Sequence, residues 1–247
     1  MSVVLVTGGS RGIGAATCVL AAERGHDVVF GYTSDSAAAD AVTERVRSLG
    51  RAAVAVRGDV AVERDVEALF DAAGELGPLT GVVNNAGITG NSPGRLDEQS
   101  AATVRRVLEV NVTGVFLCCR AAVRRMSTRY GGAGGAIVNV TSTAARLGSA
   151  GEWVHYAASK AAVETMSFGL AREVAREGVR VNVVAPGSVR TDLHAAAGMP
   201  DRPERMAALT PAGRVGEPGE IAEAIIWLLG AGASYATGSV LTVSGGL

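Results

Sequence analysis

Residues 3–14 read VVLVTGGSRGIG, an apolar, strand-like run that passes directly into a glycine-rich turn. Glycines in such a turn carry no Cβ, so the backbone can bend sharply and approach a pyrophosphate at the N-terminus of the following helix. The spacing of Gly8, Gly12 and Gly14 differs from G-x-G-x-x-G and implies a longer loop. We therefore predict a dinucleotide-binding turn with the contacts Gly8, Ser10, Arg11, Gly12, Ile13 and Gly14.

Outward from this turn, strand-like runs alternate with helical periodicity. The predicted strands are 3–7, 27–31, 52–57, 79–84, 136–141, 179–184 and 239–243. The predicted helices are 12–24, 38–49, 62–76, two within 97–128, 156–177 and 218–229. This alternation predicts right-handed βαβ units and a parallel sheet that helices cover on both faces. The expected fold is α/β, a doubly wound, Rossmann-like, seven-stranded parallel sheet in one nucleotide-binding catalytic domain over residues 1–247.

The one long interruption of the alternation is segment 188–216, which is rich in Pro, Gly, Ala and Arg. It is longer than an ordinary connection between a strand and a helix. We predict that it forms a lid or a substrate-binding segment.

Composition excludes several classes of function. A net charge of −1 gives no support to binding of bulk nucleic acid or membrane surfaces. Cys18, Cys118 and Cys119 fit neither a disulfide framework nor a zinc spacing, and they predict buried thiols in a reducing cytoplasm. No apolar run reaches the roughly 20 residues of a membrane span, and a signal peptide is not expected.

The end of the second strand bears on the choice of cofactor. An acid there would bind the adenosine ribose hydroxyls and repel a 2′-phosphate. The chain instead has Tyr32, Thr33 and Ser34, with no acid before Asp35, and Arg11 offers a cation near the same ribose. These hydroxyls and this guanidinium favour NADP(H) over NAD(H). The alternative is a solvated Arg11, with Asp35 turned inward to bind NAD.

Two further segments follow strands at the same predicted edge. Asp59 and Val60 follow the third strand, where an aspartate can bind the adenine amino group. Residues 84–87 read NNAG at the end of the fourth strand. There the small residues would let the adenosine half pass close to the backbone, and an Asn side chain could pin neighbouring strand ends. A plain turn is the alternative for this segment, whose predicted contacts are Asn85, Ala86 and Gly87.

Lys160 is the only lysine among 23 basic residues, and it follows Tyr156 by four positions. Residues at i and i+4 share one face of a helix. A compact ammonium near a phenol favours the phenolate and lowers its pKa. Tyr156 could then exchange a proton with an alcohol or carbonyl as hydride moves to or from a nicotinamide. Ser142, at the end of the fifth strand, can donate a hydrogen bond to the carbonyl oxygen.

With these motifs in order along essentially the whole chain, the sequence resembles the short-chain dehydrogenases/reductases. The resemblance implies that Tyr156 is the acid/base and that Lys160 lowers its pKa and holds the nicotinamide ribose. It implies that Ser142 orients the substrate and that Asn111 binds a proton-relaying water. It also implies a homotetramer packed through 97–128 and 156–177. The residues implied to line the nicotinamide are Pro186, Gly187, Val189 and Thr191.

The sequence departs from the family pattern in two places. Ser142 precedes Tyr156 by 14 residues, one more than usual, so either the intervening loop holds an extra residue or Thr143 is the donor. Ser244 stands near the end of the chain, where many members have Asp.

The segments expected to face the substrate are mostly small or apolar: Trp153, 148–151, Leu193 and 188–216. We expected no fixed cation there to bind a carboxylate. The leading hypothesis is thus an NADP(H)-dependent carbonyl reductase or alcohol dehydrogenase for a small, largely neutral substrate, with a sugar as one candidate.

Two alternatives remain open. One is a 3-oxoacyl carrier-protein reductase, in which a basic cluster docks an acidic acyl carrier protein; that cluster would be Arg124, Arg125, Arg129 and Arg172. The other is a catalytically silent nucleotide-binding or scaffold protein, against which the intact Asn/Ser/Tyr/Lys set argues.

Overall fold

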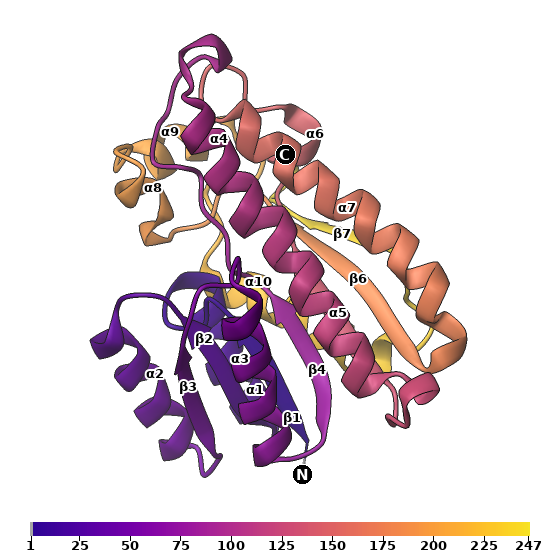
Figure 1. Cartoon of the computed structure of the whole chain (residues 1–247). Helices are drawn as coiled ribbons and strands as arrows, with labels where there is room; N and C mark the ends of the chain where they lie inside the picture. The colour runs from indigo at the N-terminus through magenta and orange to yellow at the C-terminus, as the bar shows by residue number, and fades with distance from the viewer. Residues whose placement is uncertain (1) are drawn as a thin grey trace.

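The computed structural model describes residues 2–247, apart from the side chain of His194, and forms one parallel seven-stranded sheet in the order β3-β2-β1-β4-β5-β6-β7 (Figure 1). The strands are β1 Val3–Thr7, β2 Asp27–Tyr32, β3 Ala53–Arg57, β4 Leu79–Asn84, β5 Gly135–Val140, β6 Val179–Pro186 and β7 Val240–Val243. This confirms the predicted doubly wound, Rossmann-like α/β fold.

Helices cover both faces of this sheet. They are α1 Gly12–Glu23, α2 Ser36–Ser48, α3 Glu63–Leu76, α4 Ala101–Leu108, α5 Gly114–Met126, α6 Ala144–Leu147, α7 Val154–Val174, α8 Asp192–Ala196, α9 Arg202–Leu209 and α10 Pro218–Leu229. None of the helices between residues 2 and 247 is both long and apolar enough to cross a membrane.

Two apolar cores flank the sheet because strand side chains alternate between its faces. Val4 and Val6 of β1 pack into one core with residues of α1, α2 and α10. Val3 and Leu5 pack into the other with residues of α3, α5 and α7. The strands therefore have two buried faces, which explains their nearly continuous Val and Ile content.

The site is positioned by the point at which the strand order reverses. From β1 the chain moves outward through β2 to β3, and it then crosses back to β4 on the other side of β1. Such a reversal opens a crevice beyond the carboxyl ends of the central strands. The register pairs Thr7 with Asn84 and Asn84 with Asn139, which aligns three chemistry-bearing strand ends at one edge.

The structure differs from the predicted elements in three places. Segment 188–216 contains the short helices α8 and α9, whose few turns give weak periodicity in the sequence. The one-turn helix α6 lies in the loop that holds the extra residue before Tyr156. The two helices within 97–128 are joined by a π-helical turn, Glu109–Thr113, and such turns are frequent at functional sites.

Candidate active site

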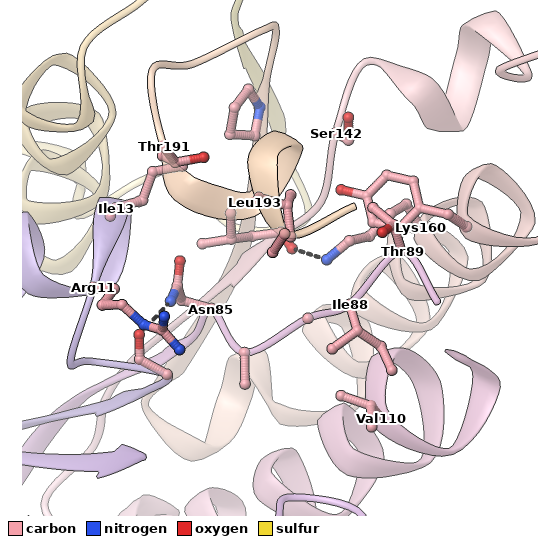
Figure 2. Close-up of a pocket in the computed structure, with 18 of the residues that line it drawn as sticks. Arg11, Ile13, Asn85, Ile88, Thr89, Val110, Ser142, Lys160, Thr191 and Leu193 are labelled. Atoms are coloured by element: carbon pink, nitrogen blue, oxygen red, sulfur yellow. Dashed lines mark hydrogen bonds between the residues drawn. The ribbon is translucent and has the colours of Figure 1, made fainter. Parts of the chain in front are cut away.

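A cavity of about 1010 Å³ lies at the carboxyl ends of the strands and draws its wall from both halves of the chain. Figure 2 shows Arg11 and Ile13 at one end, Ser142 and Lys160 at the other, and Asn85 between them. This volume and elongated shape suit a dinucleotide with a small molecule beside it.

The glycine turn has the backbone that a close approach requires. Gly8 and Gly12 have φ of +64° and +54°, a region that disfavours side chains. A Cβ on Gly14 would lie 2.1 Å from the carbonyl oxygen of Gly8. Gly14 therefore keeps the turn compact and does not itself line the cavity.

Asn85 joins this turn to the end of β4. Its Nδ2 donates to the carbonyl oxygens of Thr7 at 3.1 Å and Gly8 at 3.0 Å. The Thr7 hydroxyl in turn accepts from the backbone N–H groups of Asn85 and Ala86, both at 3.0 Å. The expected pinning of neighbouring strand ends by an Asn is confirmed, and the 84–87 segment is more than a plain turn.

The end of the cavity near Arg11 carries cations and hydroxyls. Arg11, Tyr32 and Thr33 line it, whereas Ser34 is exposed outside the wall. Asp35 is absent from the wall because its Oδ1 caps α2 by accepting from the Ala38 N–H at 3.0 Å. Its Oδ2 lies 4.0 Å from the Arg11 guanidinium.

Arg57, at the end of β3, is a second cation at this end that sequence reasoning missed. It lines the cavity, and its Nε donates to the Thr33 carbonyl at 3.0 Å. The signal was present in the sequence, because the register places the end of β3 beside the end of β2, with Tyr32 opposite Arg57.

Asp59 and Val60 line the cavity, and their contact with an adenine stays a prediction. The Asp59 carboxylate already has two partners. Oδ1 accepts from the Ala61 N–H at 2.9 Å, and Oδ2 pairs with Arg106 of α4. Any contact between Asp59 and an adenine amino group would share the carboxylate with Arg106.

Lys160 is buried, and its Nζ donates to the Val140 carbonyl at 2.9 Å (Figure 2). A Cβ on Gly87 would lie 3.1 Å from this Nζ. The absence of a side chain at Gly87 therefore leaves room for the ammonium. Burial lowers the pKa of Lys160 to about 8. Its Nζ is 5.6 Å from the centre of the Tyr156 ring, and both side chains line the cavity.

Burial raises the pKa of Tyr156, while a hydrogen bond with Ser142 and the positive charge of Arg202 act in the opposite direction. From the sequence we expected the Lys160 ammonium and the nicotinamide to lower the pKa of Tyr156, but burial has the largest effect and raises it. Ser142, rather than Thr143, has its hydroxyl beside the phenol. Ser142 Oγ also accepts from the Ala144 N–H at 3.1 Å, which fixes its direction.

Asn111 lies beneath the cavity wall, in the π-helical turn. Its Oδ1 accepts from the Ile88 N–H at 2.9 Å, and its Nδ2 donates to the Ile88 carbonyl at 2.8 Å and to Ser159 Oγ at 3.0 Å. These bonds tie the loop after β4 to α7, the helix that carries Tyr156 and Lys160.

The cavity wall near the start of segment 188–216 is formed by Pro186, Gly187, Val189 and Thr191. The two ends of that segment are joined, since Arg190 N–H donates to the Gly216 carbonyl and Gly216 N–H donates to the Ser188 carbonyl, both at 2.9 Å.

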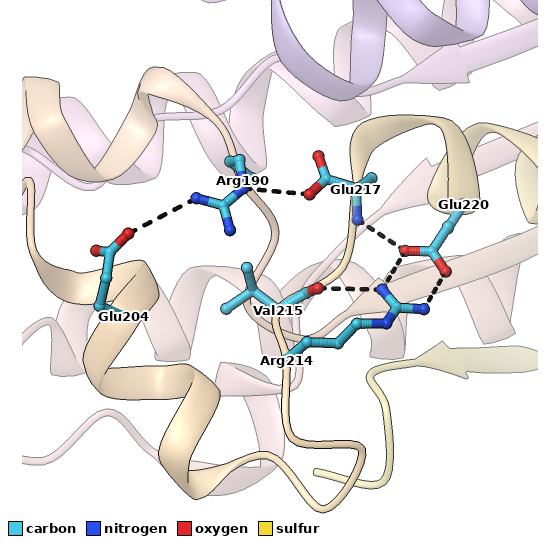
Figure 3. Close-up of polar contacts among 6 residues, drawn as sticks. All are labelled: Arg190, Glu204, Arg214, Val215, Glu217 and Glu220. Carbon is cyan, nitrogen blue, oxygen red and sulfur yellow. Dashed lines mark hydrogen bonds and ion pairs between the residues drawn. The ribbon is translucent and has the colours of Figure 1, made fainter.

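Ion pairs reinforce the join (Figure 3). Arg190 reaches Glu204 of α9 at 3.6 Å and Glu217 at 3.1 Å. Arg214 pairs with Glu220 at 2.7 Å and holds the pKa of that carboxyl at about 2.

A cation does lie in the cavity wall beside Trp153. The expectation that this region holds no fixed cation is therefore wrong. Arg202, the first residue of α9, lines the cavity and lies over the Trp153 ring at 5.2 Å. Its Nη2 is 2.8 Å from Glu152 Oε2. In the sequence this arginine is one of many, and only the fold of segment 188–216 brings it near Tyr156.

Most of the predicted site residues line this one cavity. Within the part of the chain that the structure describes, Gly14, Ser34 and Asn111 do not. The wall residues that sequence reasoning missed include Arg57, Arg106, Glu152 and Arg202. The glycine turn, the hydrogen bonds by which Asn85 holds it, and the space around Lys160 together fit a dinucleotide.

Comparison with known proteins finds matches over nearly the full length of this chain. A family described as Enoyl-(Acyl carrier protein) reductase matches residues 8–247. Uncharacterized oxidoreductase YgfF of Escherichia coli (strain K12) is 47% identical over 100% of both chains. Cis-4-hydroxycyclohexanecarboxylate dehydrogenase of Sinomonas cyclohexanicum is 44% identical over 99% of this chain and 95% of its own.

A similar solved structure is a blue fluorescent protein from a metagenomic library in complex with NADPH. It is 36% identical with a TM-score of 0.89, and the match covers 99% of this chain and 97% of that one.

Proposed function

The chain belongs to the short-chain dehydrogenase/reductase family, and we propose that it is an NADP(H)-dependent enzyme that interconverts a small secondary alcohol and its carbonyl. The similar proteins reported above are named an oxidoreductase and a dehydrogenase, which favours an enzyme over a silent scaffold. The single observation that carries the proposal is the meeting of Ser142, Tyr156 and Lys160 in one cavity with the glycine turn.

The bound nicotinamide would supply hydride to a carbonyl or accept it from an alcohol. The chain's own residues would move the proton and hold the reactants. Tyr156 would donate its phenolic proton to the carbonyl oxygen, because burial keeps the phenol protonated at neutral pH. Ser142 would donate to the same oxygen, and Lys160 would present its buried ammonium to the cofactor ribose.

A spectrophotometric screen at 340 nm with NADPH and NADH tests this function. The substrates should include aldehydes, sugars, 3-oxoacyl thioesters and ring ketones such as 4-methylcyclohexanone and 4-oxocyclohexanecarboxylate. The ring ketones are chosen because one relative is named for a hydroxycyclohexane acid. Absence of oxidation of either cofactor over the whole panel would contradict the proposal.

The preference for NADPH is proposed from Arg11 and Arg57, with support from the similar structure in complex with NADPH. A hydrogen bond to a charged group contributes about 1.5–3 kcal/mol. We therefore expect Arg11→Gln and Arg57→Gln each to weaken NADPH binding about tenfold or more and to leave NADH binding unchanged. Quenching of protein fluorescence during cofactor titration measures both dissociation constants.

A matched control for these variants is Arg45→Gln, which removes an arginine that lies outside the cavity wall. Equal weakening of NADPH and NADH by Arg11→Gln and Arg57→Gln would mean that these arginines do not contact the 2′-phosphate.

The second candidate, an acyl carrier-protein reductase, draws support from the description of the matched family. Its basic cluster is partly paired, because Arg125 binds Glu67 and Asp71. Arg172 follows Tyr156 by 16 residues on α7, about 24 Å along the helix. Within one chain, a carrier protein docked at the cluster would hold its acyl group far from Tyr156, which disfavours this candidate.

The double variant Arg129→Glu/Arg172→Glu separates the two candidates. We expect it to reduce 4-methylcyclohexanone and a 3-oxoacyl carrier thioester as well as the parent does. Loss of activity on the carrier thioester alone, in the same 340 nm assay, would establish the second candidate instead.

We also propose the homotetramer and a cytoplasmic location expected from the sequence. Phe116 of α5 and Phe168 of α7 are half exposed on the two helices named for subunit packing, and burial between subunits would remove this apolar surface from water. A sedimentation mass of one chain at micromolar concentration would contradict the tetramer.

A further inference from the structure

Arg202 is held at the substrate end of the cavity by an ion pair and an aromatic ring. Its side chain is only 14% exposed, and its guanidinium carbon lies 5.2 Å from the centre of the Trp153 ring. Nε and Nη2 donate to the same oxygen of Glu152, at 3.1 and 2.8 Å. The guanidinium is thus fixed in position before any substrate arrives.

The remaining donors of Arg202 have no strong partner. Nη1 is not held by Glu152, and its contact with Ser188 Oγ, at 3.5 Å, is at the limit of a hydrogen bond. Ser188 directly follows Gly187, which lines the catalytic part of the cavity. The edge formed by Nη1 and Nη2 is the geometry that a carboxylate accepts in a bidentate pair.

Two arginines share the carboxylate of Glu152 at this point. Arg205 lies 3.9 Å from the other oxygen of Glu152, so two guanidinium groups surround one carboxylate. The nearby wall includes Leu147, Leu193 and Met206, which offer no competing charge. Asp192 is the other acid in this part of the wall, and it belongs to the first turn of α8.

We propose that Arg202 binds a carboxylate group of the substrate, so that the physiological substrate is an oxo acid or hydroxy acid with its carboxylate a few carbons from the reacting carbon. This inference rests on the oxidoreductase activity proposed above. The charge of Arg202 also reaches Tyr156, since it opposes the rise that burial causes in the pKa of the phenol. One small molecule could therefore contact both side chains.

The test compares two ketones of nearly equal shape, 4-oxocyclohexanecarboxylate and 4-methylcyclohexanone. The parent enzyme should reduce the acid with kcat/KM about 10- to 100-fold higher, the effect of a hydrogen bond to a charged group. Arg202→Gln should remove this preference by raising KM for the acid far more than KM for the neutral ketone. Arg45→Gln is the control, because Arg45 is an exposed arginine outside the wall and has no part in the pairs with Glu152.

Glu152→Gln tests the same contact in the opposite direction. The amide retains an oxygen that can accept from Arg202, but it no longer competes as an anion, so KM for the acid should fall. This variant keeps the proposal testable if Arg202→Gln fails to fold. An unchanged or higher KM for the acid in Glu152→Gln would overturn the proposal.

Other outcomes separate this inference from the proposed function. Equal loss on both ketones in Arg202→Gln would mean that Arg202 only pins α9 to Glu152. Reduction of both ketones by the parent with no preference for the acid would overturn the carboxylate contact but leave the oxidoreductase activity intact. If neither ketone is reduced, calorimetric titration with 4-oxocyclohexanecarboxylate still measures the contact, and a Kd that Arg202→Gln does not weaken would overturn it.

Discussion

Substitution of Tyr156 by Phe is expected to lower kcat about 10³-fold, within the usual range for general acid–base catalysis. The variant retains the ring that fills the half-buried position between Ser142 and Lys160, but it has no proton to give to the carbonyl oxygen. Steady-state rates at 340 nm on any ketone that the parent reduces measure this loss.

Two controls show that the loss is chemical. Cofactor dissociation constants and the thermal unfolding midpoint of Tyr156→Phe should match those of the parent, because only a hydroxyl is removed. An undiminished kcat would mean that another group supplies the proton, and the role given to Tyr156 would be wrong.

Substitution of Lys160 by Arg is expected to lower kcat/KM about 10²-fold, the scale of a misplaced reacting group. Nζ lies 2.9 Å from the Val140 carbonyl and beside Gly87, where a single Cβ would already come within 3.1 Å. A planar guanidinium is wider than an ammonium and cannot occupy this space without displacing its neighbours. The reduction assay at pH 7 measures the effect.

The pH profile gives this prediction a second measurement. Burial lowers the pKa of Lys160 to about 8, so the ammonium is present below that pH and is lost as pH rises through it. Carbonyl reduction by the parent should therefore fall above about pH 8. An arginine stays charged throughout, so the residual activity of Lys160→Arg should lack this fall.

The surface exchange Arg24→Lys is the matched control, since Arg24 is an exposed arginine paired with Glu223. It should leave activity unchanged. A fully active Lys160→Arg enzyme would show that the ammonium has no specific role.

The fold was largely predictable because its signals are local. Each strand is a short apolar run, and helices such as α2 and α3 place their apolar residues on one face. The π-helical turn at Glu109–Thr113 was not predictable, since its one extra residue per turn hardly alters the pattern. The short helices α6 and α8 have too few residues to show any periodicity.

The site was predictable where residues lie in a motif and not where they meet through the fold. Tyr156 and Lys160 share a helix face, so their spacing alone brings them together. Arg202 and Glu152 are 50 residues apart, and no pattern in either segment indicates that they pair across the cavity. The pKa direction at Tyr156 was missed for the same reason, because burial depends on the packed structure.

The joined ends of segment 188–216 make substrate range and catalytic chemistry separable in this chain. The backbone bonds between Arg190 and Gly216 and between Gly216 and Ser188 close the segment at its base, like the neck of an Ω-shaped loop. Changes in length or sequence within α8 and α9 would leave Tyr156, Lys160 and the glycine turn where they are. We therefore expect exchanges within α8 and α9 to change the substrate range of this chain while its catalytic core stays in place.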